Sequence, residues 1–396
     1  MIDPQSKSDL DSSIPQVPDQ VQPAENVFSE DGQAPAPVEA SPETIAAPHR
    51  AHAARPPGPG LLESAAWMIG MLAVQIGALV LTVVLIFAKA VLMEEIDIAR
   101  SGPAELANRL LALLQGQLLA IVGVSQLATI VYGFLAIKLR LRPSGIRRLG
   151  WQFPSSFHWP LVALLMPPMW LLSSSLINVL LKWMPWAEDS MKGMLESFAE
   201  APLWLGVLVI GMGPALAEEL VFRGLIGRGL VARWGLVPGM LITSILFGVM
   251  HVHPVQAMGV IPLGLAMHFA YFTTRSFWAP MTLHLLNNSL SVLWVKLGME
   301  GTRLDKLVEA NSDLPLPIFA AAVAMVITIA LLLWQTRVRY VLPDGSDWNP
   351  GYISTEVPPA EVNAIAAHQK ARSLLVAGSV LSTLGFAAAL WTFAAG

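Results

Sequence analysis

Long apolar runs constrain this chain more than any other feature. A helix needs about 20 mostly apolar residues to cross the hydrocarbon core of a bilayer. The candidate segments are 65–88, 116–137, 159–181, 203–222, 236–252, 256–274, 277–295, 316–335 and 373–394. The sequence therefore predicts an all-α fold, a polytopic transmembrane helical bundle with about nine spans.

The composition agrees with a membrane protein and excludes several functions. Only 13% of the residues are charged, whereas soluble domains carry about 25%. The 24 Lys and Arg residues are balanced by 28 Asp and Glu residues, which argues against a nucleic-acid partner. The chain has no cysteine, so disulfides, thiolate catalysis and cysteine metal sites are excluded.

The chain divides into four predicted regions. Residues 1–60 hold 11 of the 30 prolines and nine acidic residues, a composition that predicts a disordered cytoplasmic tail. Residues 61–158 contain two helices and a basic loop, 159–300 contain the polar core, and 301–396 contain the last two helices. Basic residues recur in every second connection. Because cytoplasmic loops are rich in Lys and Arg, we expect an integral protein of the cell membrane with its N-terminus inside.

Ionisable residues inside the spans concentrate between 214 and 288. Placing one such side chain at the bilayer centre costs about 2.5–3.5 kcal/mol on insertion scales. A residue kept there at this cost is therefore a candidate for a functional or structural role. Glu219 and Arg223 are four residues apart, which predicts a supporting ion pair on one helix face. The neighbouring Glu218 points about 100° away and has no local partner. We interpret Glu218 as a candidate general base.

Polar side chains occupy two later spans as well. His251 follows Phe247 by four residues in the segment 236–252. His284 and Asn288 share one face of the segment 277–295 because they are four residues apart, whereas Asn287 is expected to point away. We interpret His268 as structural and His253 as interfacial, because Pro254 should end the helix there.

These side chains are predicted to converge in a cavity between spans four, five and seven. Glu218 and His251 are about equally many residues from the turn near Trp234. If the helix of span four continues to about residue 232, both side chains therefore lie at the same depth in the membrane. Glu218 and His251 would then activate water, while His284 and Asn288 would donate hydrogen bonds to an oxyanion. A second interpretation makes Glu218, His251 and His284 the ligands of a zinc ion. No metal or other cofactor is assigned from the residue types alone.

The three motifs together resemble those of the CAAX protease and bacteriocin-processing family of intramembrane peptidases. The resemblance covers about 214–290 and rests on matching motifs in matching order: Glu218, Glu219 and Arg223; Phe247 and His251; His284 and Asn288. It implies an intramembrane endopeptidase that hydrolyses membrane-associated or lipid-anchored peptides. It also implies that Glu218 and His251 activate water and that His284 and Asn288 hold the oxyanion.

Two other functions fit the same polar residues. A proton-coupled transporter could use Glu218 as a relay, although such proteins often contain internal repeats, and no second copy of the polar cluster occurs. A catalytically silent immunity or scaffold protein could keep the fold without the chemistry. The complete set of polar residues favours the peptidase.

Overall fold

The computed structural model describes residues 58–93, 102–141, 145–188, 202–297, 304–308, 313–348 and 355–395. All of them belong to one unit, Ala54–Gly396. The predicted tail, up to residue 57, lies outside the described residues.

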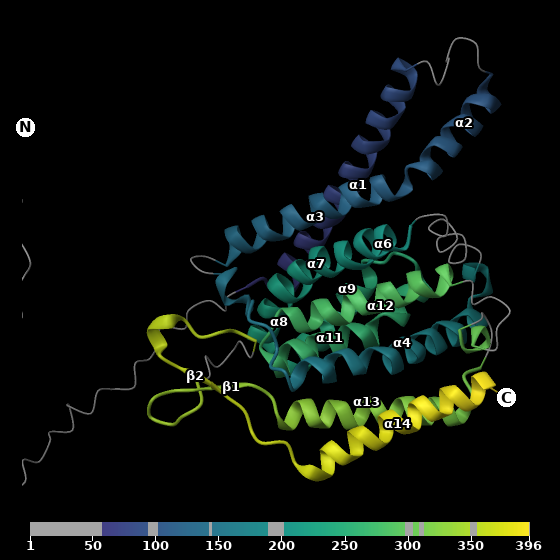
Figure 1. Ribbon diagram of the computed structural model, residues 1–396. Helices are drawn as coiled ribbons and strands as arrows, with labels where there is room; N and C mark the ends of the chain where they lie inside the picture. The colour runs from purple at the N-terminus through teal and green to yellow at the C-terminus, as the bar shows by residue number, and fades with distance from the viewer. Residues whose placement is uncertain are drawn as a thin grey trace, which may run out of the picture. The chain divides into compact units, whose positions relative to one another are not determined.

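Helices account for most of the described chain (Figure 1). They are α1 (Leu61–Leu92), α2 (Pro103–Gly116), α3 (Leu118–Arg140), α4 (His158–Trp183), α6 (Leu203–Gly206), α7 (Gly213–Glu219), α8 (Gly227–Trp234), α9 (Leu236–Val249), α10 (Pro254–Gly259), α11 (Ile261–Thr274), α12 (Trp278–Lys296), α13 (Leu316–Gln335) and α14 (Ser373–Ala395). Short 3-10 turns lie at Arg147–Leu149, Pro185–Ala187, Asp305–Leu307 and Ala360–Val362.

Seven helices of the described chain are long and apolar enough to cross a membrane. They are Leu61–Leu92, Leu118–Arg140, His158–Trp183, Leu203–Trp234, Pro254–Thr274, Leu316–Gln335 and Ser373–Ala395. The other two predicted spans are also helical, but α9 has only 14 residues and α12 carries several polar side chains. The helical membrane fold is confirmed, and the count of nine stays a prediction.

Two features depart from the sequence interpretation. Helix α2 precedes α3 and buries none of its side chains. Strands β1 (Arg339–Val341) and β2 (Ile365–Ala367) form a small antiparallel sheet, with Tyr340 opposite Ala366. The all-α prediction is therefore wrong for this hairpin, because strands of three residues are too short to show an alternating pattern.

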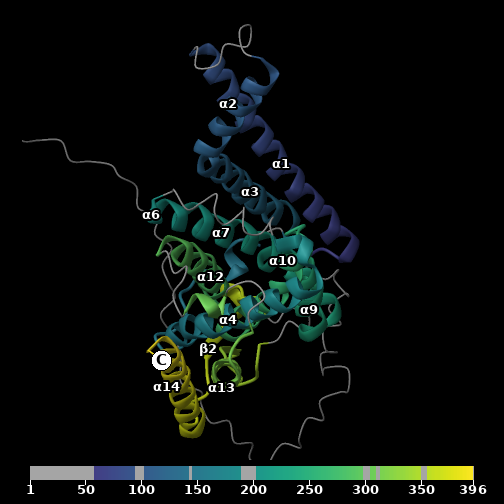
Figure 2. The same cartoon turned by 90° about the vertical axis from the view of Figure 1, so that its right-hand side faces the viewer.

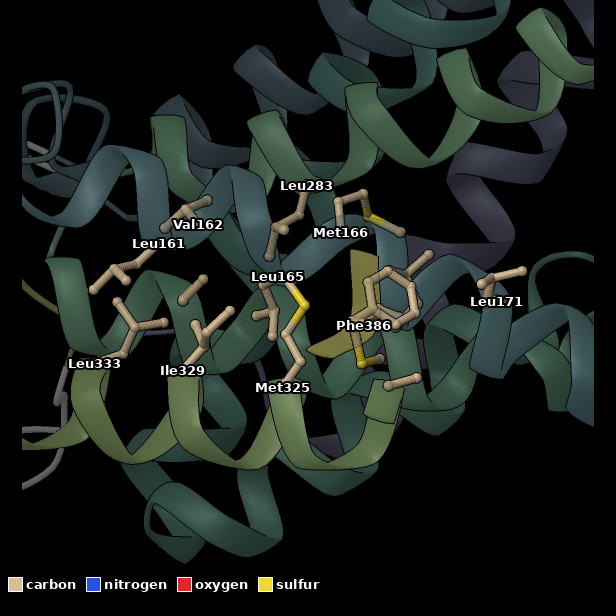
Figure 3. Close-up of a cluster of buried hydrophobic side chains, with 14 of the residues drawn as sticks. Leu161, Val162, Leu165, Met166, Leu171, Leu283, Met325, Ile329, Leu333 and Phe386 are labelled. Atoms are coloured by element: carbon tan, nitrogen blue, oxygen red, sulfur yellow. The ribbon is translucent and has the colours of Figure 1, made fainter. Parts of the chain in front are cut away.

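The helices pack in three neighbouring groups. Helix α1 packs along α3, and α13 packs along α14. Figures 1 and 2 show the run 203–234 with α4, α9, α11 and α12 between these two pairs. The largest apolar cluster joins α4, α11, α12 and α13, with Phe386 contributed by α14 (Figure 3). This cluster positions α4 and α12 for the polar contacts described below.

Basic residues from three separate segments meet at one end of the bundle around Glu356. The Glu356 carboxylate lies 2.8 Å from Arg148 Nη1 and 3.3 Å from Arg228 Nη2. Arg275 Nη1 donates to the Glu356 main-chain oxygen at 3.1 Å, and burial lowers the pKa of Arg275 to about 10. Basic segments that the charge pattern assigns to one side therefore lie at one end, whereas the assignment of that end to the cytoplasm stays a prediction.

Candidate active site

The site begins on one continuous helical run, Leu203–Trp234. The condition that this helix continues to about residue 232 is met. Two π-helical segments interrupt its regular spacing, at Val207–Met212 and Leu220–Ile226. Such segments frequently mark functional sites. Glu218 and Glu219 are the last residues of α7, directly before the second π-helical segment.

Glu219 and Arg223 form the predicted ion pair. Arg223 Nη1 donates to Glu219 Oε1 at 2.7 Å, and both side chains are fully buried. The other end of the guanidinium donates to the main-chain oxygen of Gly264 at 2.9 Å. Its central carbon lies 4.7 Å from the centre of the Phe247 ring, within the range of a cation–π contact. Arg223 therefore ties its own helix to α9 and α11.

His284 lies between the two glutamates. Its Nδ1 is 2.9 Å from Glu219 Oε1, and its Nε2 is 3.8 Å from Glu218 Oε2. A glutamate oxygen that pairs with Arg223 is an acceptor, so the Nδ1 of His284 carries the proton of this hydrogen bond. The orientation of the imidazole is therefore set by Glu219, which leaves Nε2 on the side of Glu218.

Glu218 differs from Glu219 in its surroundings. The Glu218 side chain keeps 16% of its surface exposed, whereas Glu219 is fully buried and the His284 side chain is 4% exposed. The two adjacent carboxylates can therefore have different roles. Glu219 supports its neighbours, while Glu218 remains accessible to a small molecule.

His251 was predicted inside a helix, and the structure places it just beyond one. Helix α9 ends at Val249, and His251 lies in the turn before α10. Its Nδ1 is 3.1 Å from the main-chain oxygen of Phe247. The Phe247 ring contacts both imidazoles edge to face, with centroid distances of 5.1 Å to His251 and 5.8 Å to His284. No hydrogen bond or ion pair joins His251 to Glu218 among the described residues.

Asn288 has a clear local partner. Pro214 has no N–H, so the carbonyl of Ile210 four residues earlier lacks its usual helical donor. Asn288 Nδ2 donates to that carbonyl at 2.9 Å. The amide nitrogen carries a second N–H, which leaves one donor for a ligand. Asn287 Nδ2 donates to Asn288 Oδ1 at 2.9 Å, so the expectation that Asn287 points away from this face is wrong.

The two remaining histidines of the region lie outside the cluster. His268 is 1% exposed in α11, and its Nδ1 has no partner within the described residues. His253 precedes Pro254 at the start of α10, where its side chain accepts a hydrogen bond from the main-chain nitrogen of Gln256. The predicted helix end before Pro254 is confirmed.

The fit of these residues to a metal ion can be tested on their geometry. No group of three or more His, Asp or Glu side chains in the described part of the chain is arranged to hold a metal. Glu218 and His284 face each other, but His251 directs Nδ1 to the main-chain oxygen of Phe247 in the preceding helix. The proposed zinc ligands therefore do not assemble as a set, and no reaction step is assigned to a metal.

Comparison with known proteins supports the motif reading. Residues 200–290 match the family model described as type II CAAX prenyl endopeptidase Rce1-like. A putative membrane peptidase of Bacillus subtilis (strain 168), YdiL, is 29% identical over 105 residues. That alignment covers 26% of this chain and 42% of YdiL, so the chain matches less than half of that relative. No solved structure matches.

These matches confirm the resemblance for the segment that carries all three motifs. The segment runs from the start of the run 203–234 to the second half of α12. The described structure is a helical membrane fold, and this segment of it is similar to membrane peptidases.

Proposed function

We propose that this protein is an intramembrane endopeptidase that hydrolyses peptide bonds of membrane-associated or lipid-anchored peptides. The observation that carries the proposal is the position of His284 between Glu218 and Glu219, in a helix that also bears Asn288. A carboxylate beside an imidazole, with an amide one turn further along the same helix, suits the addition of water to a carbonyl group.

Glu218 is assigned as the general base. Its carboxylate removes a proton from water, and the resulting hydroxide forms a bond to the carbonyl carbon of the substrate. The electron pair of the carbonyl double bond moves to oxygen, which becomes the oxyanion. When the C–N bond breaks, the proton held by Glu218 passes to the leaving amine. His251 is assigned to steer the attacking water through a hydrogen bond.

His284 and Asn288 are assigned to the oxyanion. The separation of 3.8 Å between His284 Nε2 and Glu218 Oε2 is too long for a hydrogen bond. The two atoms are therefore free to contact different oxygens of the tetrahedral intermediate, Glu218 the oxygen that comes from water and His284 the oxyanion. Asn288 offers the N–H that does not bond Ile210.

The contact with Glu219 imposes a condition on His284. Since Nδ1–H donates to Glu219, Nε2 can donate to an oxyanion only when the ring carries both protons. A neutral ring would instead present an Nε2 lone pair and accept a proton beside Glu218.

The proposed substrates follow from the position of the site. Glu218 and His284 belong to helices embedded among apolar spans, so the scissile bond must enter from the membrane or its surface. A lipid-anchored tail or a transmembrane segment meets this requirement. The fold and the matches to membrane peptidases support this class of substrate.

The experiment is a cleavage assay with purified protein in detergent, using lipid-anchored and transmembrane peptides and mass spectrometry of the products. Glu218→Gln and His284→Ala should each reduce cleavage by about 100-fold or more. Matched controls are Glu361→Gln and His368→Ala, which change the same residue types at exposed positions. Cleavage that persists in both site variants would refute the proposal. Stoichiometric zinc together with loss of activity on chelation would favour the zinc interpretation.

A further inference from the structure

Helix α12 has a continuous polar face that extends beyond His284 and Asn288. At 100° per residue, five side chains follow one another within an arc of about 120°: Trp294, Asn287, Ser291, His284 and Asn288. On the flank of this arc next to Trp294, Leu283, Leu290 and Leu286 pack into the largest apolar cluster. The polar face explains why α12 is not apolar enough to count as a span.

Helix α4 contributes to the same region. Trp170 Nε1 donates to Ser291 Oγ at 3.1 Å, and the rings of Trp170 and Trp294 lie 5.1 Å apart. Ser173 is three residues beyond Trp170 and therefore shares its helix face. Figures 1 and 2 show α4 beside α12, in agreement with their contacts. We call Trp170, Ser173, Asn287, Ser291 and Trp294 the α4–α12 face.

Two groups of this face lack a partner among the described residues. Trp294 Nε1 and Ser173 Oγ are buried atoms without a hydrogen bond, and Ser173 is only 8% exposed. Buried polar groups are almost always hydrogen-bonded. In a bilayer, where no bulk water is present, an intramembrane polar group without a protein partner indicates a ligand or a water-filled cavity.

A peptide awaiting hydrolysis has the complementary need. The main chain around the scissile bond must leave its helix to expose a carbonyl group, and its freed N–H and C=O groups then require partners inside the membrane. Trp294 Nε1 can donate to a carbonyl, while the Ser173 hydroxyl can donate or accept. The paired tryptophan rings offer apolar surface to the side chains of such a segment.

We propose that the α4–α12 face binds the unwound substrate segment next to the scissile bond. The proposal rests on the proposed function, because the face is continuous with His284 and Asn288 on one helix. Trp294 lies ten residues beyond His284, about 15 Å along the helix axis. That length corresponds to four or five residues of extended chain, at about 3.3 Å each. Trp294 and Ser173 bind the substrate main chain and take no part in the bond-breaking step.

The test measures binding separately from cleavage. A fluorescein-labelled leucine–alanine peptide, long enough to span the bilayer, is titrated into the Glu218→Gln protein in detergent, with fluorescence anisotropy as the readout. Adding Trp294→Phe keeps an aromatic ring and removes the N–H donor. The dissociation constant should rise about threefold to tenfold, the change expected for one lost hydrogen bond. Trp391→Phe, an exposed position in α14, is the matched control and should leave Kd unchanged.

Stability and kinetics complete the test. Because Trp294 Nε1 has no protein partner in the described chain, Trp294→Phe should not lower the unfolding temperature. In the otherwise unmodified protein, it should raise KM for a cleaved peptide more than it lowers kcat. An unchanged Kd, or an equal rise in the Trp391→Phe control, would overturn the binding face. Trp294-dependent binding without any cleavage by the unmodified protein would instead refute the proposed peptidase and leave the face intact.

Discussion

Replacing Glu219 by glutamine should affect stability and catalysis by two separable routes. The carboxylate of Glu219 pairs with Arg223 at 2.7 Å and with His284 at 2.9 Å. The side chains of Glu219 and Arg223 are both fully buried. Glutamine keeps the size and one oxygen acceptor but removes the charge. The buried Arg223 guanidinium then loses the carboxylate to which it is hydrogen-bonded.

The expected magnitude follows from that burial. Breaking one partner of a buried ion pair costs about 3–5 kcal/mol. The hydrogen bond of Arg223 to Gly264 and its contact with Phe247 retain part of the interaction, so we expect the lower end of this range. Catalysis should fall by about 100-fold, because glutamine can turn either its oxygen or its nitrogen towards His284 and no longer fixes the ring.

The double variant Glu219→Gln/Arg223→Met separates the two effects. Removing the unpaired cation should restore most of the stability, since replacing a buried ion pair by uncharged residues of similar volume is often neutral. The double variant should not restore cleavage, because His284 still lacks the negatively charged carboxylate that accepts its Nδ1–H.

Denaturant titration in mixed micelles measures the free energy of unfolding, and peptide cleavage measures kcat. The reasoning is refuted if the single variant is as stable as the unmodified protein. It is also refuted if the double variant regains full activity, because Glu219 would then serve only to neutralise Arg223.

Three further predictions concern other parts of the fold. Glu356→Gln should lower the free energy of unfolding by about 3–5 kcal/mol, because Arg148 and Arg228 share its 4%-exposed carboxylate. Thermal unfolding measured beside the exposed control Glu361→Gln checks this, and equal unfolding temperatures of the two variants would contradict it. Asn288→Ala should cost about 1–3 kcal/mol by removing the donor to Ile210, and no loss of stability would show that this carbonyl finds another partner. Compartment reporters fused to the two termini should report opposite sides of the membrane, with the N-terminus inside; both on one side would exclude an odd number of spans.

Local spacing in the sequence was enough to predict part of the site. The four-residue interval between Glu219 and Arg223 predicted their ion pair, since residues at this spacing share a helix face. The apolar runs predicted the helices of the membrane bundle. Pro254 likewise signalled the end of a helix, although the structure ends α9 slightly earlier and leaves His251 in the turn.

Contacts between distant segments could not be predicted in this way. The approach of His284 to both glutamates depends on how α12 packs against the run 203–234. The π-helical segments depend on tertiary packing as well, and no residue pattern in the sequence predicts them. Pro214 leaves the carbonyl of Ile210 without its usual donor, and only the fold identifies Asn288 as the donor that replaces it.

The same limit applies to the basic end of the bundle. Charge patterning predicted that the basic segments containing Arg148, Arg228 and Arg275 lie on one side. Their common acceptor Glu356 belongs to the segment between β1 and α14, more than 80 residues beyond the last of these arginines. Such a long-range pairing leaves no periodic signal in the sequence.

The central claim is that Glu218 and His284 act together on one reacting group. A double-variant cycle tests this most directly, with kcat/KM for peptide cleavage measured for Glu218→Gln, His284→Ala and the combined variant. Groups that act as a unit have strongly non-additive effects, so the combined variant should be no more than a few-fold slower than the slower single variant. Multiplication of the two single losses, or unchanged cleavage in either single variant, would contradict the account.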